Sequence, residues 1–326
     1  MLTASKLSLL AILVSVATQA SSQEQSKLPR IGVLMTGSEA SSRIQLNGLR
    51  KGLADAGIAE GSGVVLDIRY ADGKVDQLSA LAADLVKSRP AVLFTGGDQG
   101  ASAVKRAATG QLPIVAVTCD ALAAGLVSNL ARPGENLSGV TCINADLAAK
   151  RVEIMKGLTP SLSRLGIALN LSDKRMVSEL QESERAGAVQ SVAISSLNIT
   201  NPDDIENALT IAAEKQLGGV IFVFDAMTFF YRARVAKAAI ERGLPTGFNF
   251  RQYPDAGGLF SYGPNLADMY RQSARHILKV IKGEAPGEIP MEQPTRFELV
   301  INLKTAKALG LTIPPTLLTH ANDVIE

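Results

Sequence analysis

The sequence predicts an α/β fold with two lobes, each built on a doubly wound parallel sheet. From Arg30 onward, ten short runs of apolar and β-branched residues alternate with amphipathic helical patterns. Most of these runs are almost continuously apolar, which is typical of strands that helices cover on both faces of a parallel sheet. The chain has 326 residues, more than one ordinary hydrophobic core needs and a length that suits two lobes.

The ten predicted strands fall into two series of five. The first series is Ile31–Met35, Val64–Tyr70, Ala91–Thr95, Ile114–Thr118 and Gly139–Ile143. The second series is Leu165–Leu169, Ser191–Ser195, Val220–Phe224, Thr246–Phe248 and Leu259–Tyr262. Helical spacing lies between them, as in Leu78, Leu81, Ala82 and Leu85. Five β/α units followed by five more predict two doubly wound lobes.

The last part of the chain predicts that the lobes exchange segments. We expect a helix over Leu266–Lys282, a crossing that contains Pro286, Pro290 and Pro294, and a final strand-helix unit over Phe297–Leu309. We therefore assign residues 28–144 plus 264–290 to the first lobe and residues 145–263 plus 291–326 to the second. Several short crossings make a multi-segment hinge, which suits closure of the lobes around a ligand.

The N-terminus has the pattern of a secretory signal peptide, which we assign to residues 1–22. Lys6 supplies the positively charged n-region, and Leu7–Ala17 is the apolar stretch. Small residues follow, and we expect cleavage after Ala20. The apolar stretch is shorter than the ~20 residues that span a bilayer, so an uncleaved membrane anchor is the weaker alternative. No cysteine lies near the cleavage point, which argues against a lipoprotein. We expect a mature protein in the periplasm.

Composition and motifs exclude several functions. The formal net charge is +2 and no long run of Lys and Arg occurs, so we expect no nucleic-acid partner. The two histidines, His276 and His320, do not follow strand ends, and no HExxH, GxSxG or Cys/His metal spacing is present. Residues 35–38 lack the GxGxxG pattern of a dinucleotide site. We expect no enzyme, no cofactor and no metal, although absent motifs do not address catalysis by Asp or Glu.

The predicted strand ends identify candidate ligand-binding residues, because open parallel sheets bind ligands at the C-terminal ends of their strands. In the first lobe these candidates are Thr36, Gly37, Ser38, Gly96, Gly97, Asp120 and Thr141. In the second lobe they are Asn170, Phe224, Asp225, Phe250 and Tyr262.

Three of these strand ends have a specific chemical use and a simpler alternative. Gly96-Gly97 leads into a helix predicted over Gln99–Ala108, where backbone N–H groups and the helix N-terminus would favour a ligand carboxylate. The alternative is a plain tight turn. Asp225 and Asp120 follow strands and could each receive a ligand ammonium. The alternative for both is a helix N-cap.

Aromatic residues are concentrated in one part of the chain. The sequence has 9 Phe, 5 Tyr and no Trp. Ten of these lie between positions 222 and 262: Phe222, Phe224, Phe229, Phe230, Tyr231, Phe248, Phe250, Tyr253, Phe260 and Tyr262. We expect Phe222 and Phe260 in the core, whereas rings at strand ends could form a flat-walled apolar pocket. The alternative is a core that uses Phe in place of Leu.

The mature chain has two cysteines, Cys119 and Cys142. Adjacent fourth and fifth strands would bring them to the same edge of the first sheet. Export would permit a disulfide, and two buried thiols are the alternative.

Five segments resemble the family of ABC-transporter substrate-binding proteins of the TrpX-like, tryptophan- and tyrosine-binding kind. They are RIGVLMTG at 30–37, LVSNLARPGENLSGVT at 126–141, FFYRARVAKAAIERGLP at 229–245, AGGLFSYGPNLADMYRQSA at 256–274 and EQPTRFELVINLKTAKALGLTIPPTLL at 292–318. The resemblance implies two Rossmann-like lobes in the type I periplasmic-binding fold. It also implies an amino-acid-like ligand and, as partners, an ABC permease and an ATPase.

The resemblance carries over to particular positions only where the pattern matches. These are Met35-Thr36-Gly37, Asp225 and Ser261-Tyr262-Gly263. The chain departs at Cys119-Asp120, where relatives have Ala-Asp or Gly-Asp, and at Asn249, where Gly is more usual. Together the observations predict a monomeric solute-binding protein of an ABC importer that closes on its ligand by population shift. The alternatives are a periplasmic receptor for a signalling partner and the effector domain of a repressor, which the export signal disfavours.

Overall fold

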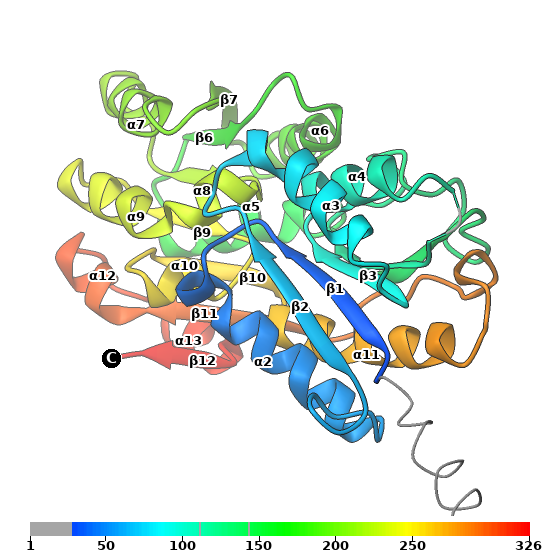
Figure 1. Ribbon diagram of the computed structural model, residues 1–326. Coiled ribbons are helices and arrows are strands. Elements are labelled where there is room, and N and C mark those ends of the chain that lie inside the picture. Colours follow the sequence, from blue (N-terminus) through cyan, green and yellow to red (C-terminus); the bar gives the residue numbers. More distant parts are fainter. Residues whose placement is uncertain (1–27, 111, 143) are drawn as a thin grey trace, which may run out of the picture.

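The protein folds around two β-sheets, as expected (Figure 1). The computed structural model describes residues 28–110, 112–142 and 144–326. The expected signal peptide at residues 1–22 and the strand residue Ile143 lie outside this part of the chain. Among the described residues, no helix has the length and apolar character needed to cross a membrane.

The first sheet has five parallel strands in the order β2-β1-β3-β4-β5. They are β1 (Arg30–Met35), β2 (Val65–Tyr70), β3 (Val92–Gly96), β4 (Ile114–Thr118) and β5 (Leu137–Thr141). Alternate residues of β1 pack into two separate cores, Val33 on one face and Leu34 on the other. This two-sided burial explains why the strand is apolar throughout.

The second sheet has seven strands in the order β12-β11-β10-β9-β8-β6-β7. They are β6 (Arg164–Leu169), β7 (Ala193–Asn198), β8 (Val220–Phe222), β9 (Thr246–Phe248), β10 (Phe260–Pro264), β11 (Phe297–Asn302) and β12 (Asp323–Ile325). The sheet is parallel, as expected, except at β11, which pairs antiparallel with β10. No βαβ crossover joins these two strands, because the chain visits the first sheet between them, so nothing enforces a parallel direction.

Helices cover both sheets (Figure 1). They are α2 (Glu39–Asp55), α3 (Leu78–Lys87), α4 (Asp98–Ala107), α5 (Ala148–Leu158), α6 (Lys174–Val189), α7 (Asp204–Glu214), α8 (Ala226–Phe230), α9 (Arg232–Glu241), α10 (Gln252–Asp255), α11 (Leu266–Ile281), α12 (Leu303–Ala308) and α13 (Pro315–His320), with short 3₁₀ turns at Val75–Gln77 and Pro286–Glu288.

Several expected strand boundaries moved by one to three residues, as at β5, β7 and β8. Strand β5 begins at Leu137, where it pairs with Ile114, two residues earlier than expected. Strand β7 begins after Ser191, whose φ of 55° is left-handed and ends the preceding helix. Strand β8 ends at Phe222, so Phe224 lies in the loop beyond it.

Helix α11 belongs with the first sheet although it follows a strand of the second. It packs closely against α2 because two glycines of α2 face it. A Cβ at Gly48 would lie 2.3 Å from the carbonyl oxygen of Ala267, and one at Gly52 would lie 2.2 Å from that of Arg271. The chain therefore crosses between the sheets after β5, after β10 and again before β11.

The last crossing is held to the first sheet by strand-like hydrogen bonds. The backbone N–H of Thr141 donates to the Glu292 carbonyl at 2.9 Å, and the Glu292 N–H donates to the Gly139 carbonyl at 2.9 Å. The expected multi-segment hinge thus consists of three crossings, one of which lies along the edge of β5.

Candidate functional site

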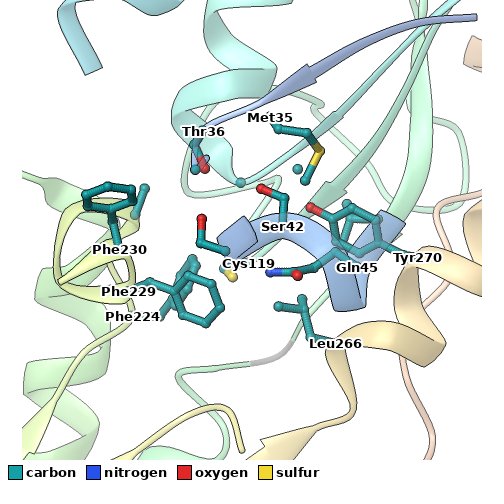
Figure 2. Close-up of a pocket in the computed structure, with 16 residues that line it drawn as sticks. Met35, Thr36, Ser42, Gln45, Cys119, Phe224, Phe229, Phe230, Leu266 and Tyr270 are labelled. Carbon is teal, nitrogen blue, oxygen red and sulfur yellow. The ribbon is translucent and has the colours of Figure 1, made fainter. Parts of the chain in front are cut away.

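A cavity lies between the two sheets, at the C-terminal ends of the strands (Figure 2). It holds ≈ 550 Å³ of empty space, part of it open to solvent. Residues at the ends of β1, β3 and β4 and on α2 and α11 form one wall, and the segment around α8 forms the other. We call it the aromatic cavity because Phe224, Phe229, Phe230 and Tyr270 line it.

Three phenylalanines form the wall that the second lobe contributes. Figure 2 shows Phe224 and Phe229 together below Cys119, with Phe230 further out. The rings of Phe224 and Phe229 meet edge to face, with centroids 5.6 Å apart. Behind them Phe250 is fully buried, edge to face with Phe224 at 4.9 Å. Tyr253 is buried behind Phe229 at 5.6 Å, so the cavity rings rest on a rigid aromatic core.

The first lobe contributes small and polar groups. Thr36, Gly37, Gly96 and Gly97 line the cavity, as four of the predicted ligand residues. A Cβ at Gly96 would lie 1.6 Å from the hydroxyl of Tyr270. Only glycine therefore leaves room for this ring, which stands edge to face with Phe94 at 5.5 Å. Burial raises the pKa of Tyr270, so its hydroxyl stays protonated.

Gln45 of α2 lies at the inner end of the aromatic cavity, beside Leu266 (Figure 2). It is 4% exposed, and its Oε1 has no hydrogen-bond partner within the described part of the chain. A buried unpaired amide costs free energy unless another group satisfies it. Gln45 was not predicted from the sequence, because it lies within a helix rather than at a strand end, about one turn after Ser42 on a buried face that continues with Leu46 and Leu49.

A second cavity adjoins the first and shares Cys119 and Phe224 with it. We call it the charged cavity because Asp98, Asp120, Arg175 and Glu179 line it. Cys119 therefore lies where the two cavities meet.

An ion pair joins the two lobes at the charged cavity. Nη1 of Arg175, on α6, lies 2.9 Å from Oδ2 of Asp98, on α4. Oδ1 of Asp98 also accepts hydrogen bonds from the backbone N–H of Cys119 at 3.0 Å and of Asp120 at 3.3 Å. Burial raises the pKa of Asp98, and the Arg175 guanidinium offsets part of that rise. This contact links the end of β4 to α6 of the second lobe.

A second, fully buried ion pair lies beneath the charged cavity. Arg151 of α5 is 0% exposed, and its Nη2 lies 2.5 Å from Oε1 of Glu179. The guanidinium also donates to the carbonyls of Asn144 at 2.7 Å and Tyr262 at 3.1 Å. Nδ2 of Asn249 donates to the same carboxylate oxygen at 3.3 Å. These bonds tie the first crossing to the second sheet. Burial raises the pKa of Glu179 despite the nearby Arg151.

Four predicted ligand residues have their side chains engaged in local structure. Asp225 Oδ1 accepts from the N–H of Met227 at 2.8 Å and of Thr228 at 3.2 Å, so this carboxylate is the N-cap of α8. Ser38 is the N-cap of α2. Thr141 Oγ1 accepts from the Ala121 N–H at 3.2 Å, and Asn170 Oδ1 accepts from the Ser172 N–H at 3.0 Å.

Three further predicted residues lie at different depths. Asp120 lines the charged cavity, and its Oδ1 also accepts from the Ala123 N–H at 2.9 Å. Phe250 belongs to the core behind Phe224. Tyr262 offers its carbonyl to Arg151, and its ring packs 6.4 Å from that of Phe297.

The two cysteines are free thiols. Their Sγ atoms lie 3.6 Å apart. The hydrogen bond to Cys142, together with burial, raises the pKa of the Cys119 thiol well above its usual range. No group of three or more His, Cys, Asp or Glu side chains within residues 28–110, 112–142 and 144–326 could hold a metal ion.

The fold and the cleft between its lobes define a class of protein: two-lobed binding proteins that enclose a small ligand. Residues 30–325 match the profile of the family described as ABC transporter substrate binding protein. The chain belongs to this family, whose members act outside the cytoplasm.

One relative is similar in sequence, and two solved structures are similar in fold. The chain is 25% identical over 268 residues to the "Tyrosine-binding protein" of Clostridioides difficile (strain R20291). The aligned region covers 81% of this chain and 76% of that protein. A conserved domain protein from Vibrio cholerae superposes with a TM-score of 0.85 at 24% identity, over 91% of this chain and 100% of that one. An ABC domain from Streptococcus pneumoniae in complex with L-Trp also gives 0.85 at 24%, over 92% and 100%.

Proposed function

We propose that this chain binds an aromatic amino acid outside the cytoplasm and delivers it to the permease and ATPase of an ABC importer. The observation that carries the proposal is the interlobe cleft, in which an aromatic cavity and a charged cavity have Cys119 and Phe224 as a common wall. Two relatives support the ligand class, the tyrosine-binding protein and the domain in complex with L-Trp.

The aromatic cavity suits the ligand side chain. Among the described residues that line it, none has a side chain that is charged at neutral pH. The rings of Phe224 and Phe229 present flat apolar surfaces, against which an aromatic side chain gains both burial and ring contacts. Gln45 at the inner end would satisfy its free amide oxygen with a ring N–H or O–H of the ligand.

The ligand backbone would lie near Cys119, where the two cavities meet. Thr36, Gly37 and the start of α4 after Gly97 would hold the carboxylate, because a helix N-terminus favours an anion. Asp120 would receive the ammonium from the charged cavity. Asp120 takes this role in place of Asp225, because the Asp225 carboxylate accepts hydrogen bonds from two backbone N–H groups of its own helix.

Closure would follow from contacts with both lobes. A ligand that touches Phe224 on one side and Gln45 on the other stabilises the closed arrangement and shifts the population toward it. The lobes would comprise residues 28–144 plus 264–290 and 145–263 plus 291–326. We propose that the protein works as a monomer, without a catalytic step.

A ligand screen tests the proposal. The mature, ligand-stripped protein is tested by thermal shift against L-tryptophan, L-tyrosine, L-phenylalanine, L-leucine, ribose and adenine. An aromatic amino acid at 100 times its dissociation constant should stabilise the fold by about 2.7 kcal/mol. Stabilisation by ribose or adenine alone, or by none of the six, would contradict the proposed ligand class.

The aromatic wall has a matched pair of variants. Phe224→Ala removes a ring of the cavity, whereas Phe297→Ala removes a ring that packs on Tyr262 elsewhere. L-Tryptophan affinity measured by calorimetry should fall at least tenfold in Phe224→Ala and stay within about twofold of wild type in Phe297→Ala. Equal losses in both variants would remove the aromatic cavity as the binding site.

A further inference from the structure

Cys119 and Cys142 occupy equivalent positions on neighbouring strands. Each directly follows a strand end, and the residues before them, Thr118 and Thr141, are register partners of β4 and β5. The backbone N–H of Cys142 donates to the Thr118 carbonyl at 2.9 Å, which extends the ladder to the cysteines themselves. Their Sγ atoms are 3.6 Å apart, so the thiols are in contact.

The two thiols differ in access. Cys119 is partly exposed and lines both the aromatic and the charged cavity, beside Phe224 (Figure 2). Cys142 is 4% exposed and lies on the inner side, with its Sγ 3.7 Å from Sδ of Met269 on α11. This arrangement provides an accessible thiol for attack on an oxidant and a buried thiol next to it that can complete the reaction.

We propose that Cys119 and Cys142 form a reversible disulfide in the wall of the ligand cleft, which makes the cleft a site of covalent modification. Export to an oxidising compartment supplies the conditions in which such a bond persists. The oxidant is a disulfide, either of a protein or of glutathione. Because the pKa of the Cys119 thiol is raised, its thiolate is a minor form and the first step is slow: this thiolate attacks one sulfur of that disulfide and releases one thiol, leaving a mixed disulfide.

Cys142 then attacks the Cys119 sulfur of the mixed disulfide and releases the second thiol. The two cysteines together lose two protons and two electrons, and the oxidant becomes two thiols. Reduction by a dithiol runs the same steps backward.

The bond would change the cleft because the sulfurs must move. A disulfide needs an S–S distance of about 2.05 Å, against the 3.6 Å between the present thiols. Cys142 is confined by Met269 on its far side, so much of the movement falls on Cys119. The Cys119 N–H is bonded to Asp98, which pairs with Arg175 of the other lobe. Oxidation therefore reshapes the cavity wall and shifts a contact that joins the lobes.

A thiol count tests the disulfide without any ligand. The full mature chain is equilibrated in glutathione buffers from fully reduced to fully oxidised, then denatured, alkylated and weighed by mass spectrometry. We expect two alkylated thiols at the reduced end and none at the oxidised end, with a single monomer band on a non-reducing gel. Two free thiols at every ratio, stable glutathione adducts, or disulfide-linked dimers alone would overturn the proposal.

Calorimetry with L-tryptophan tests the consequence for binding, which depends on the proposed function. The dissociation constants of the oxidised and reduced forms should differ at least fivefold. The double variant Cys119→Ser/Cys142→Ser should show the same constant in both buffers. Equal constants for the two wild-type forms would overturn the effect on the cleft. If L-tryptophan, L-tyrosine and L-phenylalanine bind neither form, the proposed function fails while the thiol count still decides the disulfide.

Discussion

Replacing Arg151 by methionine should destabilise the protein through a single uncompensated charge. Arg151 is 0% exposed and makes hydrogen bonds to Glu179, Asn144 and Tyr262. In Arg151→Met, the Glu179 carboxylate keeps only the 3.3 Å bond from Asn249 among the contacts described above. Removing one partner of a buried ion pair costs about 3–5 kcal/mol, because the other charge stays buried and unpaired. We expect a loss of this size in the free energy of unfolding at pH 7.5.

The pH dependence gives this prediction a second readout. Burial already raises the pKa of Glu179 in the folded protein, and loss of the Arg151 charge raises it further. A carboxyl whose folded pKa exceeds its unfolded value contributes stability at low pH that is lost as the pH rises through the folded pKa. The difference in unfolding free energy between wild type and Arg151→Met should therefore become smaller as the pH is lowered from 7.5 toward 5.

Urea denaturation of wild type, Arg151→Met, Glu179→Gln and the double variant measures these effects. The double variant has no buried charge left at the pair and should recover part of the loss of Arg151→Met. A loss below about 1 kcal/mol in Arg151→Met, or a deficit that grows as the pH falls, would refute the reasoning.

The remaining predictions concern the cleft and its frame. Gln45→Leu should weaken the binding of L-tryptophan and L-tyrosine by about 1 kcal/mol, or roughly fivefold, and leave the affinity for L-phenylalanine nearly unchanged, as measured by calorimetry. Equal losses of affinity for all three amino acids would contradict a hydrogen bond from Gln45 to the ligand ring. Asp225→Ala should lower the free energy of unfolding by about 1 kcal/mol, because it removes the cap of α8, and should leave ligand affinity within twofold. Gly96→Ala should cost about 1–3 kcal/mol in urea denaturation through its clash with the Tyr270 hydroxyl. Gly96→Ala/Tyr270→Phe should recover part of that cost, and no recovery would show that another contact is responsible.

The fold could be predicted because each sheet is buried on both faces. Val33 and Leu34 pack into different cores, and this double burial produces the apolar runs from which the strands were predicted. The direction of β11 could not be predicted in this way. The apolar pattern of β11 fits a parallel or an antiparallel strand equally well. Its antiparallel pairing with β10 depends on where the chain returns from the first lobe.

The site could be predicted only where it lies at a strand end. Thr36, Gly97 and Phe224 were found because strand ends in a doubly wound lobe face the cleft, and all three line the aromatic cavity. Gln45 and Glu179 lie within helices, where one polar residue on a long amphipathic pattern gives no local signal. Gln45 lies beside Leu266, and Glu179 is bonded to Arg151 and Asn249. These neighbours belong to other elements of the fold, so only tertiary structure reveals them.

The last crossing of the chain also affects how the molecule behaves in a crowded compartment. A strand at the border of a sheet carries free N–H and C=O groups, onto which a strand of another molecule can add. Glu292 already occupies these groups at Thr141 and Gly139 on β5. The segment of the last crossing therefore also protects this border from intermolecular strand addition. We infer that changes to the hinge would alter the tendency to aggregate as well as the ease of closing.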